Sequence, residues 1–337
     1  MRVLVCSSKD LAHPSAGDAE VYIHEVNRHW AAQGHEVTLF TAAVDDRDPV
    51  ERSAGVTIIR RGARSGVYRE AREFCVDEAA GRFDLVIDHV NARPFGCASW
   101  GGDAPVVAIV HWIEPRWLRR FADVPVITLS PSSRQSLRQH GLRRVRVVPP
   151  GCDIEPRPVV TKESRPTVAF VGQLAAHKRP DDAVKAFELF RESQPDAQLW
   201  VIGTGPLERS LARRVGDHVT FYGQVGQAEK VDLLTRAHVV VVTSVREAWG
   251  LVVDEAAACG TRAVAYDLPG LRDSVPAADG LLVPPDPSAL ADELLRRLPS
   301  WAALPPTRGW RGGATSWGQV AAAVLEGARA DVAAGLS

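Results

Sequence analysis

Cysteine is scarce in this chain, and its arrangement excludes two common kinds of structural site. The five cysteines among the 337 residues are Cys6, Cys75, Cys97, Cys152 and Cys259. Their number is odd, they are widely scattered and no C-x-x-C pair occurs, which argues against a disulfide framework and against a zinc site. We therefore expect a reducing, cytoplasmic setting for this protein.

The sequence also lacks a long apolar run and an excess of charge of one sign. No segment approaches the roughly 20 apolar residues that a transmembrane helix needs. The opening residues, MRVLVCSS, are more typical of a first buried strand than of a signal peptide. The formal net charge of −1 gives no electrostatic reason to expect nucleic acid as a partner. The 45% hydrophobic content is that of a folded soluble protein.

Short apolar runs alternate with longer helical patterns, which is typical of parallel βαβ units. Several runs are unbroken by polar residues, as expected of strands that helices cover on both faces. A helical pattern at 19–32 separates the first two runs, and Gly34 follows its end. The predicted strands are 3–6, 36–40, 56–60, 85–88, 106–110, 126–129 and 145–148, then 167–171, 198–202, 219–222, 239–242, 262–265 and 281–283.

The pattern breaks in the middle of the chain and then restarts. Pro149-Pro150-Gly151 ends the first block, and 155–166 holds several prolines and charges without periodicity. We predict an N-terminal domain at 1–152, a linker at 153–166 and a C-terminal domain at 167–314. A closing helix in 315–337 could cross back to the first domain. In such doubly wound sheets, ligands bind beyond the carboxyl ends of the strands.

The most specific segment lies at 244–261, where a buried strand leads through a loop into a helix. Glu247 lies in the loop, the helix begins near Gly250, and Glu255 falls in its second turn. The first backbone N–H groups of a helix have no partner within it, so they can bind phosphate. Glu247 could accept hydrogen bonds from a sugar and Glu255 from both hydroxyls of a ribose. A solvated capping glutamate and a surface glutamate are the alternative explanation.

With other motifs of the chain, this E-x7-E segment resembles the retaining glycosyltransferases of family 4, which have the GT-B fold. Residues 17–20 (Gly-Asp-Ala-Glu) are similar to the family's G-G-A-E loop, and residues 34–38 match its G-H-E-V-T segment. Residues 171–178 resemble its V-G-R-L…K, and residues 269–271 and 316–317 also fit. The resemblance covers nearly the whole chain. It implies two Rossmann-like, doubly wound parallel-sheet domains that face each other across a cleft.

The resemblance further implies a nucleotide-sugar site in the C-terminal domain. There Glu247 would contact the transferred hexose, Glu255 the ribose, and Lys178 the leaving phosphate, with no metal and no cofactor. Lys178 is one of only five lysines, although an exposed lysine at a helix start is the alternative. The remaining donor-binding candidates are Gly17, Asp18, Gly172, Gln173, Arg179, Gly203, Gly205, Val225, Trp249, Gly250, Leu251 and Val252.

Acceptor candidates lie in the N-terminal domain, after two of the predicted strands. His111 follows 106–110, where the family often has a histidine close to the transferred sugar. The resemblance makes His111 a catalytic candidate together with Glu247 and Lys178, and a satisfied loop histidine is the alternative. His89 and Asn91 follow 85–88 in the same way. Arginine-rich stretches at 60–72, 116–120 and 134–146 could meet an anionic acceptor or a membrane surface. Solvated helix faces explain them more simply, because arginine is the chain's default cation.

Two positions depart from the family pattern. Gln173 stands where the family usually has a phosphate-binding arginine, and adjacent Arg179 could compensate. Asp18 replaces a glycine in a loop expected to hold phosphate, and aspartate tolerates a positive φ less well than glycine.

These observations predict a metal-independent glycosyltransferase. It would transfer a hexose from a UDP-, GDP- or TDP-linked sugar to a hydroxyl of a small-molecule, natural-product or lipid-linked acceptor. An epimerase or phosphorylase on the same fold is one alternative. A catalytically weakened homologue that binds nucleotide sugar as a regulatory or partner subunit is the other.

Overall fold

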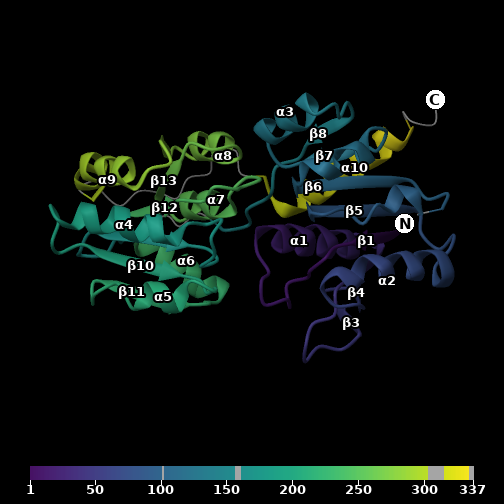
Figure 1. The fold of residues 1–337 in the computed structure, drawn as a ribbon, viewed down its shortest axis with the longest axis horizontal. Helices are drawn as coiled ribbons and strands as arrows, with labels where there is room; N and C mark the ends of the chain where they lie inside the picture. The colour runs from purple at the N-terminus through teal and green to yellow at the C-terminus, as the bar shows by residue number, and fades with distance from the viewer. Residues whose placement is uncertain (101, 156–160, 303–314, 334–337) are drawn as a thin grey trace. The chain divides into compact units, whose positions relative to one another are not determined.

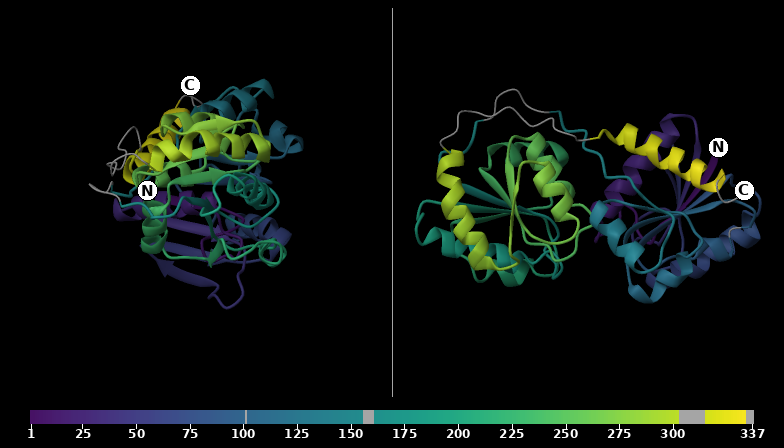
Figure 2. Two further views of the ribbon diagram at one scale, coloured as in Figure 1. Left: turned by 90° about the vertical axis from the view of Figure 1, so that its left-hand side faces the viewer. Right: turned by 90° about the horizontal axis from the view of Figure 1, so that it is seen from above.

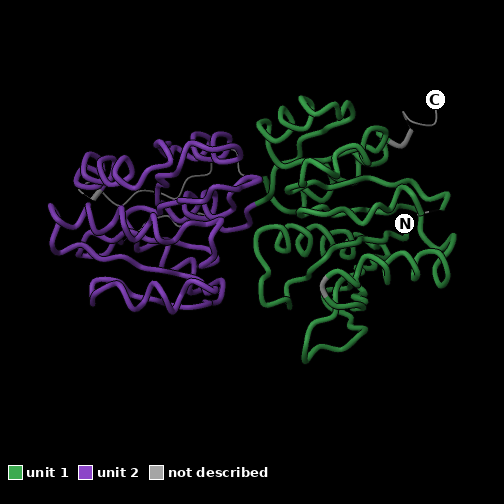
Figure 3. Tube along the Cα trace, viewed as in Figure 1, with its two compact units in different colours: residues 1–151, 315–337 green, residues 152–314 purple. Residues whose placement is uncertain are grey.

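The computed structural model describes residues 1–100, 102–155, 161–302 and 315–333. The chain divides into two compact units (Figure 3). Unit 1 comprises residues 1–151 and 315–337, and unit 2 comprises residues 152–314. Parts of the predicted linker and of the predicted domain ends, at 156–160, 303–314 and 334–337, lie outside the described residues.

Unit 1 is built on an eight-stranded sheet with the order β3-β4-β2-β1-β5-β6-β7-β8 (Figure 1). All neighbouring strands are parallel except β3, which runs antiparallel to β4 at the edge. Its strands are β1 (Arg2–Cys6), β2 (Glu36–Thr41), β3 (Val50–Ser53), β4 (Val56–Arg60), β5 (Leu85–Ala92), β6 (Val106–Ile113), β7 (Val126–Thr128) and β8 (Val145–Val147). Its helices are α1 (Asp18–Ala32), α2 (Val67–Glu73), α3 (Pro131–Gln139) and α10 (Trp317–Ala333), with short turns η1 (Arg64–Gly66), η2 (Phe74–Glu78), η3 (Cys97–Ser99) and η4 (Pro115–Phe121).

Unit 2 is built on a six-stranded, all-parallel sheet with the order β11-β10-β9-β12-β13-β14. Its strands are β9 (Thr167–Val171), β10 (Gln198–Ile202), β11 (Val219–Gly223), β12 (Val239–Val242), β13 (Arg262–Tyr266) and β14 (Leu281–Val283). Its helices are α4 (Pro180–Arg191), α5 (Glu208–Ala212), α6 (Gln227–Arg236), α7 (Leu251–Ala258), α8 (Leu271–Ala277) and α9 (Pro287–Ala302).

Alternating residues of the buried strands supply two cores in unit 2, because successive side chains of a strand point to opposite faces. Val168 and Phe170 of β9 pack with apolar residues of α4 and α9 on one face. Ala169 belongs to the other face, which α6, α7 and α8 cover. Helices therefore lie on both sides of the sheet (Figure 2). This coverage explains why the strands are unbroken apolar runs in the sequence.

The closing helix expected near the C-terminus is α10, and it belongs to unit 1. It packs against α1, where the indole Nε1 of Trp30 donates a hydrogen bond to the carbonyl of Ala321 at 2.9 Å. Gly151 makes the return possible, because a Cβ at this position would lie 2.7 Å from the backbone nitrogen of Trp317. Among the described residues, no helix is long and apolar enough to cross a membrane.

The strand order places one switch point in each sheet, where the connections turn to opposite sides. In unit 2 it lies between β9 and β12, and in unit 1 between β1 and β5. The loops that follow these four strands leave a crevice at the carboxyl edge of each sheet in folds of this type. The predicted site residues are concentrated on these loops and strand ends.

Candidate functional site

The candidate residues form two groups, one in each unit. In unit 2, the loop after β9 carries Gly172, Gln173 and Lys178, and the loop after β12 carries Glu247 and Trp249. Because β9 and β12 are neighbours in the sheet, these two loops start side by side. The sheet thus brings together residues that are about 70 positions apart in the sequence.

Lys178 and Glu247 meet directly across this switch point. The Nζ atom of Lys178 donates to Oε1 of Glu247 at 2.5 Å. The two side chains are only 16% and 6% exposed, so both charges are largely removed from water. Removing one partner of such a buried pair costs about 3–5 kcal/mol, because the other charge remains buried. The contact therefore fixes a cation beside the predicted sugar-binding carboxylate.

The backbone around Lys178 is anchored to the strand that leads to Glu247. The hydroxyl of Thr243 lies 2.9 Å from the carbonyl oxygen of Lys178 and 2.8 Å from that of Arg179, and it can donate to either. The amide of Val245 donates to the carbonyl of His177 at 2.9 Å. Arg179 adopts a left-handed conformation (φ 47°), and its guanidinium lies 3.4 Å from the carboxylate of Asp182 in α4.

Glu255 has a cationic partner of its own. The Nζ atom of Lys230, in α6, donates to Oε1 of Glu255, in α7, at 2.6 Å. Both side chains are mostly buried, at 22% and 17% exposed. The sequence analysis missed Lys230. The signal that could have identified it is the rarity of lysine, since Lys178 and Lys230 are two of only five.

The start of α7 is rigidly held. Gly250 precedes the helix with φ 94°, a left-handed conformation that favours glycine, and a Cβ there would lie 2.9 Å from Leu271. The indole Nε1 of Trp249 donates to Oδ2 of Asp254 at 2.6 Å, and the hydroxyl of Ser274 donates to the carbonyl of Trp249 at 2.6 Å. Leu251 and Val252 are the first residues of the helix, so their N–H groups lie where the sequence predicted a phosphate contact.

Burial alters the acidity of Asp254. Its side chain is surrounded by protein, and burial raises the pKa of its carboxyl group to about 6, aided by the charge of Glu255 and opposed by the hydrogen bond from Trp249. A carboxyl group of this kind is only partly ionised near pH 6. Its main structural contribution is to hold the Trp249 ring against the start of α7.

Glycines let the loops after β9 and β10 pack closely. Gly203 has φ 129°, and a Cβ there would lie 2.1 Å from the carbonyl oxygen of Gly172. A Cβ on Gly205 would lie 2.6 Å from the carbonyl oxygen of Leu174. Val225 is half-buried, lies just before α6 and packs against the core that includes α6 and α7. The region after β10 is thus a strand-to-helix turn that supports the loop of Lys178.

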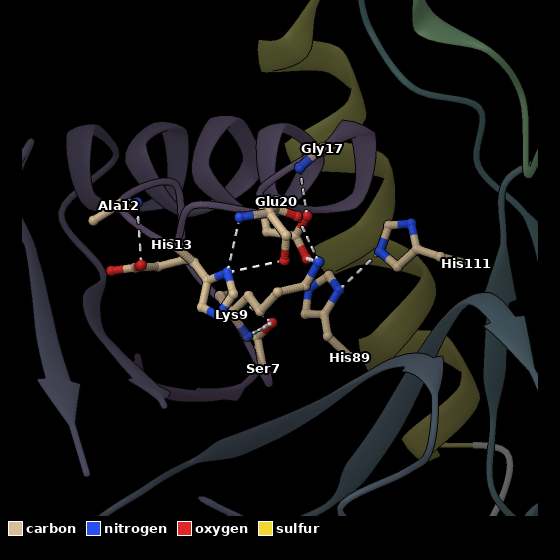
Figure 4. Close-up of polar contacts among 10 residues, drawn as sticks. Ser7, Lys9, Ala12, His13, Gly17, Glu20, His89 and His111 are labelled. Atoms are coloured by element: carbon tan, nitrogen blue, oxygen red, sulfur yellow. Dashed lines mark hydrogen bonds and ion pairs between the residues drawn. The ribbon is translucent and has the colours of Figure 1, made fainter. Parts of the chain in front are cut away.

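In unit 1, the loop between β1 and α1 is organised around a buried glutamate (Figure 4). Glu20 is only 2% exposed, and its Oε2 atom accepts the N–H of Gly17 at 2.7 Å. The Nζ atom of Lys9 lies 3.4 Å from Oε1 of Glu20 and donates to the carbonyl of Ser15 at 2.8 Å. Asp18 is the first residue of α1 and is not among the residues with positive φ. The conformational objection to aspartate at this position was therefore wrong.

The acceptor candidates lie within strands rather than after them, which corrects the sequence analysis. His89 and Asn91 belong to β5, and His111 belongs to β6. Pairing continues past an irregularity at Val90/Asn91, and Asn91 pairs with Trp112. Polar residues at these strand ends hid the continuation, because the sequence analysis followed apolar runs. The histidines still lie near the carboxyl edge of the sheet.

His89 and His111 form a buried hydrogen-bonded pair (Figure 4). Nδ1 of His89 lies 3.1 Å from Nε2 of His111. His89 is only 3% exposed and His111 only 9% exposed. Burial lowers the pKa of His111 to about 4 and that of His89 well below its ordinary value. Both rings are therefore neutral near pH 7. A group with so low a pKa is a weak general base, and it serves better as a hydrogen-bonding group.

Asp88 precedes His89 in the same candidate segment, and the structure gives it a positioning role. It is 1% exposed, and its carboxylate accepts the backbone N–H groups of Phe95, Gly96 and Cys97 at 3.1, 2.8 and 3.3 Å. These bonds fold the segment after β5 back onto the strand. Asp88 thus positions the residues that follow His89 and Asn91.

Comparisons with known proteins agree on the type of protein. The family model described as "Glycosyltransferase Family 4" matches residues 19–156, and that described as "Glycosyl transferases group 1" matches residues 153–302. The D-inositol 3-phosphate glycosyltransferase of Jonesia denitrificans is 28% identical over 354 residues, covering 84% of this chain and 83% of the relative.

Solved structures agree on the fold. Sucrose-phosphate synthase from Thermosynechococcus elongatus has a TM-score of 0.79 at 24% identity, covering 99% of each chain. HepE of Anabaena, solved in complex with UDP-glucose, has a TM-score of 0.68 at 16% identity, also covering 99% of each chain. The two family models together span most of the sequence, and both sheets have the doubly wound form of these enzymes. The chain belongs to the family 4 glycosyltransferases and has the GT-B fold.

Proposed function

We propose that this protein is a retaining transferase that moves a hexose from a nucleoside-diphosphate sugar to a hydroxyl group of an acceptor. The observation that carries the proposal is the buried contact between Lys178 and Glu247 beside the start of α7. It supplies a fixed cation, a sugar-binding carboxylate and a set of helix N–H groups within one loop region. Each matches a need of glycosyl transfer.

The chemical requirement of the reaction is to stabilise the departing diphosphate. Negative charge develops on the phosphate oxygen as the glycosidic bond breaks, and preorganised donors at that point lower the barrier. In our proposal Lys178 and the N–H groups of Leu251 and Val252 serve as these donors. Glu255 holds the ribose hydroxyls and Glu247 the hexose. We propose that the step needs neither a metal ion nor a cofactor beyond the nucleotide sugar.

The acceptor is proposed to bind in unit 1, near the His89–His111 pair. A neutral His111 would donate or accept a hydrogen bond from the sugar rather than act as a general base. The relatives and structural neighbours include a D-inositol 3-phosphate glycosyltransferase and a sucrose-phosphate synthase. Their names favour a small hydroxyl-bearing molecule as the acceptor, with natural products and lipid-linked sugars as further possibilities.

The donor nucleotide is proposed to be UDP first, with GDP and TDP as competitors. The HepE structure was solved with UDP-glucose, which favours UDP. A second candidate function is binding of nucleotide sugar without turnover, as a regulatory or partner subunit. Gln173 favours it, because a neutral amide adds no charge where the family usually has arginine.

The test is a pair of measurements on matched lysine variants. Purified protein is first screened for thermal stabilisation by UDP, GDP, TDP and ADP. A ligand at about 100 times its Kd should stabilise by about 2.7 kcal/mol. Hydrolysis or transfer of the preferred nucleotide sugar is then measured for Lys178→Ala and for Lys185→Ala, an exposed lysine of α4.

We expect Lys178→Ala to lose at least about a hundredfold in kcat, as removal of a transition-state donor does, and Lys185→Ala to lose nothing. Nucleotide binding with no turnover in the wild-type protein would support the non-catalytic candidate. No binding of any nucleotide would refute both.

A further inference from the structure

A cluster of stacked arginines in unit 1 joins Arg93 to residues of the arginine-rich stretches 60–72 and 116–120. The guanidinium carbon of Arg93 lies 4.0 Å from the ring centroid of Tyr68 and 5.8 Å from that of Trp117. That of Arg120 lies 4.8 Å from the Trp117 centroid, and that of Arg116 lies 5.4 Å from it. Two aromatic rings thus gather three guanidinium groups. We call Tyr68, Arg93, Trp117 and Arg120 the arginine cluster.

The arginine cluster lies at the carboxyl edge of the unit 1 sheet. Arg93 directly follows β5, and Trp117 and Arg120 lie in η4, the segment after β6. These are the strands that carry His89 and His111. The segment after Arg93 is held in place by the backbone N–H of Gly96, which donates to the carboxylate of Asp88. Arg120 packs closely on this segment, because a Cβ on Gly96 would lie 3.2 Å from its Nη1 atom. The cluster and the proposed acceptor site therefore share one edge of one sheet.

The arginines of the cluster are only partly paired within the described part of unit 1. Arg116 forms an ion pair with Glu114 at 2.5 Å. Among the described residues, Arg93, Arg119 and Arg120 form no ion pair. Arg93 and Arg120 are exposed at the surface. The guanidinium carbons of Arg93 and Arg120 lie 5.8 and 4.8 Å from the centroid of the Trp117 ring, and like charges held near one ring repel one another, so an anion beside them is favourable. The arrangement therefore favours a ligand with negative charge.

Stacking also prepares these side chains for a particular geometry. A guanidinium that stacks on an aromatic ring uses its face, and its N–H donors remain available in the plane. In-plane donors match the oxygen atoms of phosphate in paired hydrogen bonds, which lysine cannot reproduce. Tyr68 is itself held by Phe95, with ring centroids 4.6 Å apart, so the stack has a fixed base. The donors are preorganised before a ligand arrives.

We propose that Arg93 and Arg120, oriented by Tyr68 and Trp117, bind a phosphate group of the acceptor. This inference rests on the proposed function, because it assigns the substrate class of the same site. The phosphate could belong to a small phosphorylated polyol or to a lipid headgroup, and both offer the same oxygens. The acceptor hydroxyl would then be presented from a molecule anchored at this edge of the sheet.

The experiment uses inorganic phosphate, glycerol 3-phosphate and vesicles as probes, at constant ionic strength. Binding of the two phosphates is measured by calorimetry for the wild-type protein, for Arg93→Gln, for Arg120→Gln and for Arg138→Gln. Arg138 is an exposed arginine of α3 and serves as the matched control. We expect each cluster variant to bind phosphate at least about tenfold more weakly, and the control to bind as the wild type does.

A second measurement needs no variant, so a folding defect cannot obscure the answer. Phenylglyoxal modifies accessible arginines, and mass spectrometry identifies the modified positions. We expect phosphate to protect Arg93 and Arg120 but not Arg138. Sedimentation with phosphatidylcholine vesicles, with and without phosphatidic acid, then identifies the source. Retention on the acidic vesicles indicates a lipid headgroup, and binding of the free phosphates alone indicates a soluble acceptor.

Equal binding by the wild-type and cluster variants, or equal protection of all three arginines, would overturn the inference, as would no binding of any phosphate or vesicle. UDP stabilisation of the same proteins separates the two proposals. A protein that binds UDP but no phosphate at Arg93 and Arg120 retains the proposed function and loses this inference. A protein that binds phosphate there but neither binds nor turns over nucleotide sugar has a phosphate site without the proposed function.

Discussion

Replacement of Asp254 by asparagine should stabilise the protein at neutral pH and leave it almost unchanged near pH 4. Asp254 is 7% exposed, and burial raises the pKa of its carboxyl group from 3.8 to about 6. The folded state therefore binds more protons than the unfolded state between these two values. Stability falls as pH rises through this window, because ionising the buried carboxyl group is unfavourable. Well below pH 3.8 the group is protonated in both states, and the cost is absent.

The size of the effect follows from the two pKa values. One unit corresponds to about 1.4 kcal/mol, so the buried carboxylate costs about 3 kcal/mol above pH 6. Asparagine removes the charge and keeps a side-chain oxygen that can accept the indole N–H of Trp249. Its amide group also needs a partner, so about 3 kcal/mol is the upper bound of the gain.

The assay is thermal unfolding of the wild type, Asp254→Asn and Glu229→Gln between pH 4 and pH 8. Glu229 is an exposed acid on α6 and serves as the control. We expect the melting temperatures of wild type and Asp254→Asn to diverge as the pH rises from 4 to 6, with Asp254→Asn the more stable. Parallel curves for these two proteins would refute the reasoning. So would a control that diverges by the same amount.

Three further predictions test the packing and charge of the site. Gly203→Ala should destabilise unit 2 by more than about 2 kcal/mol in thermal unfolding, because its Cβ would lie 2.1 Å from a carbonyl oxygen. The control is Gly226→Ala, which should be nearly neutral because the space around Gly226 is open. Lys230→Ala should raise the Kd for UDP about tenfold in calorimetry, since Glu255 loses the ammonium that orients it, and an unchanged Kd would contradict this role. Glu20→Gln should raise stability in urea unfolding near pH 7, because burial raises the pKa of the Glu20 carboxyl group more than the charge of Lys9 lowers it, and a loss of stability would show that the Lys9 contact outweighs burial.

The sequence predicts most strands well because helices cover them on both faces. Strands such as β9 and β12 are unbroken apolar segments, and their bounds agree with the structure. The edge strand β3 was missed, since Val50–Ser53 contains one apolar residue and three polar ones. Edge strands of this kind have a solvated side and leave no apolar run to detect.

Local motifs indicate which residues belong to the candidate site, but not which side chains contact each other in it. Local patterns place Lys178 and Glu247 in loops that follow two predicted strands, and the structure shows that these strands are neighbours and joins the two side chains. The Lys230–Glu255 contact depends on how α6 packs against α7, which no local pattern encodes. The arginine stacks have the same origin, because Arg93 and Trp117 come from separate loops. Tertiary packing therefore determines which of the many arginines become part of a cluster.

The charges around the two motif glutamates also constrain how the donor can bind. Glu247 and Glu255 each have a lysine at hydrogen-bond distance, so each of these carboxylates is already paired with a cation. In the proposed donor complex, a diphosphate would add negative charge beside these pairs, and with Gln173 no arginine stands at the family's usual phosphate-binding position. In the proposed donor complex, Lys178 would be shared between Glu247 and the phosphate, or would move from one to the other. Binding of the sugar to Glu247 and of the diphosphate to Lys178 would therefore be coupled, since each would weaken the contact that holds the other group in place.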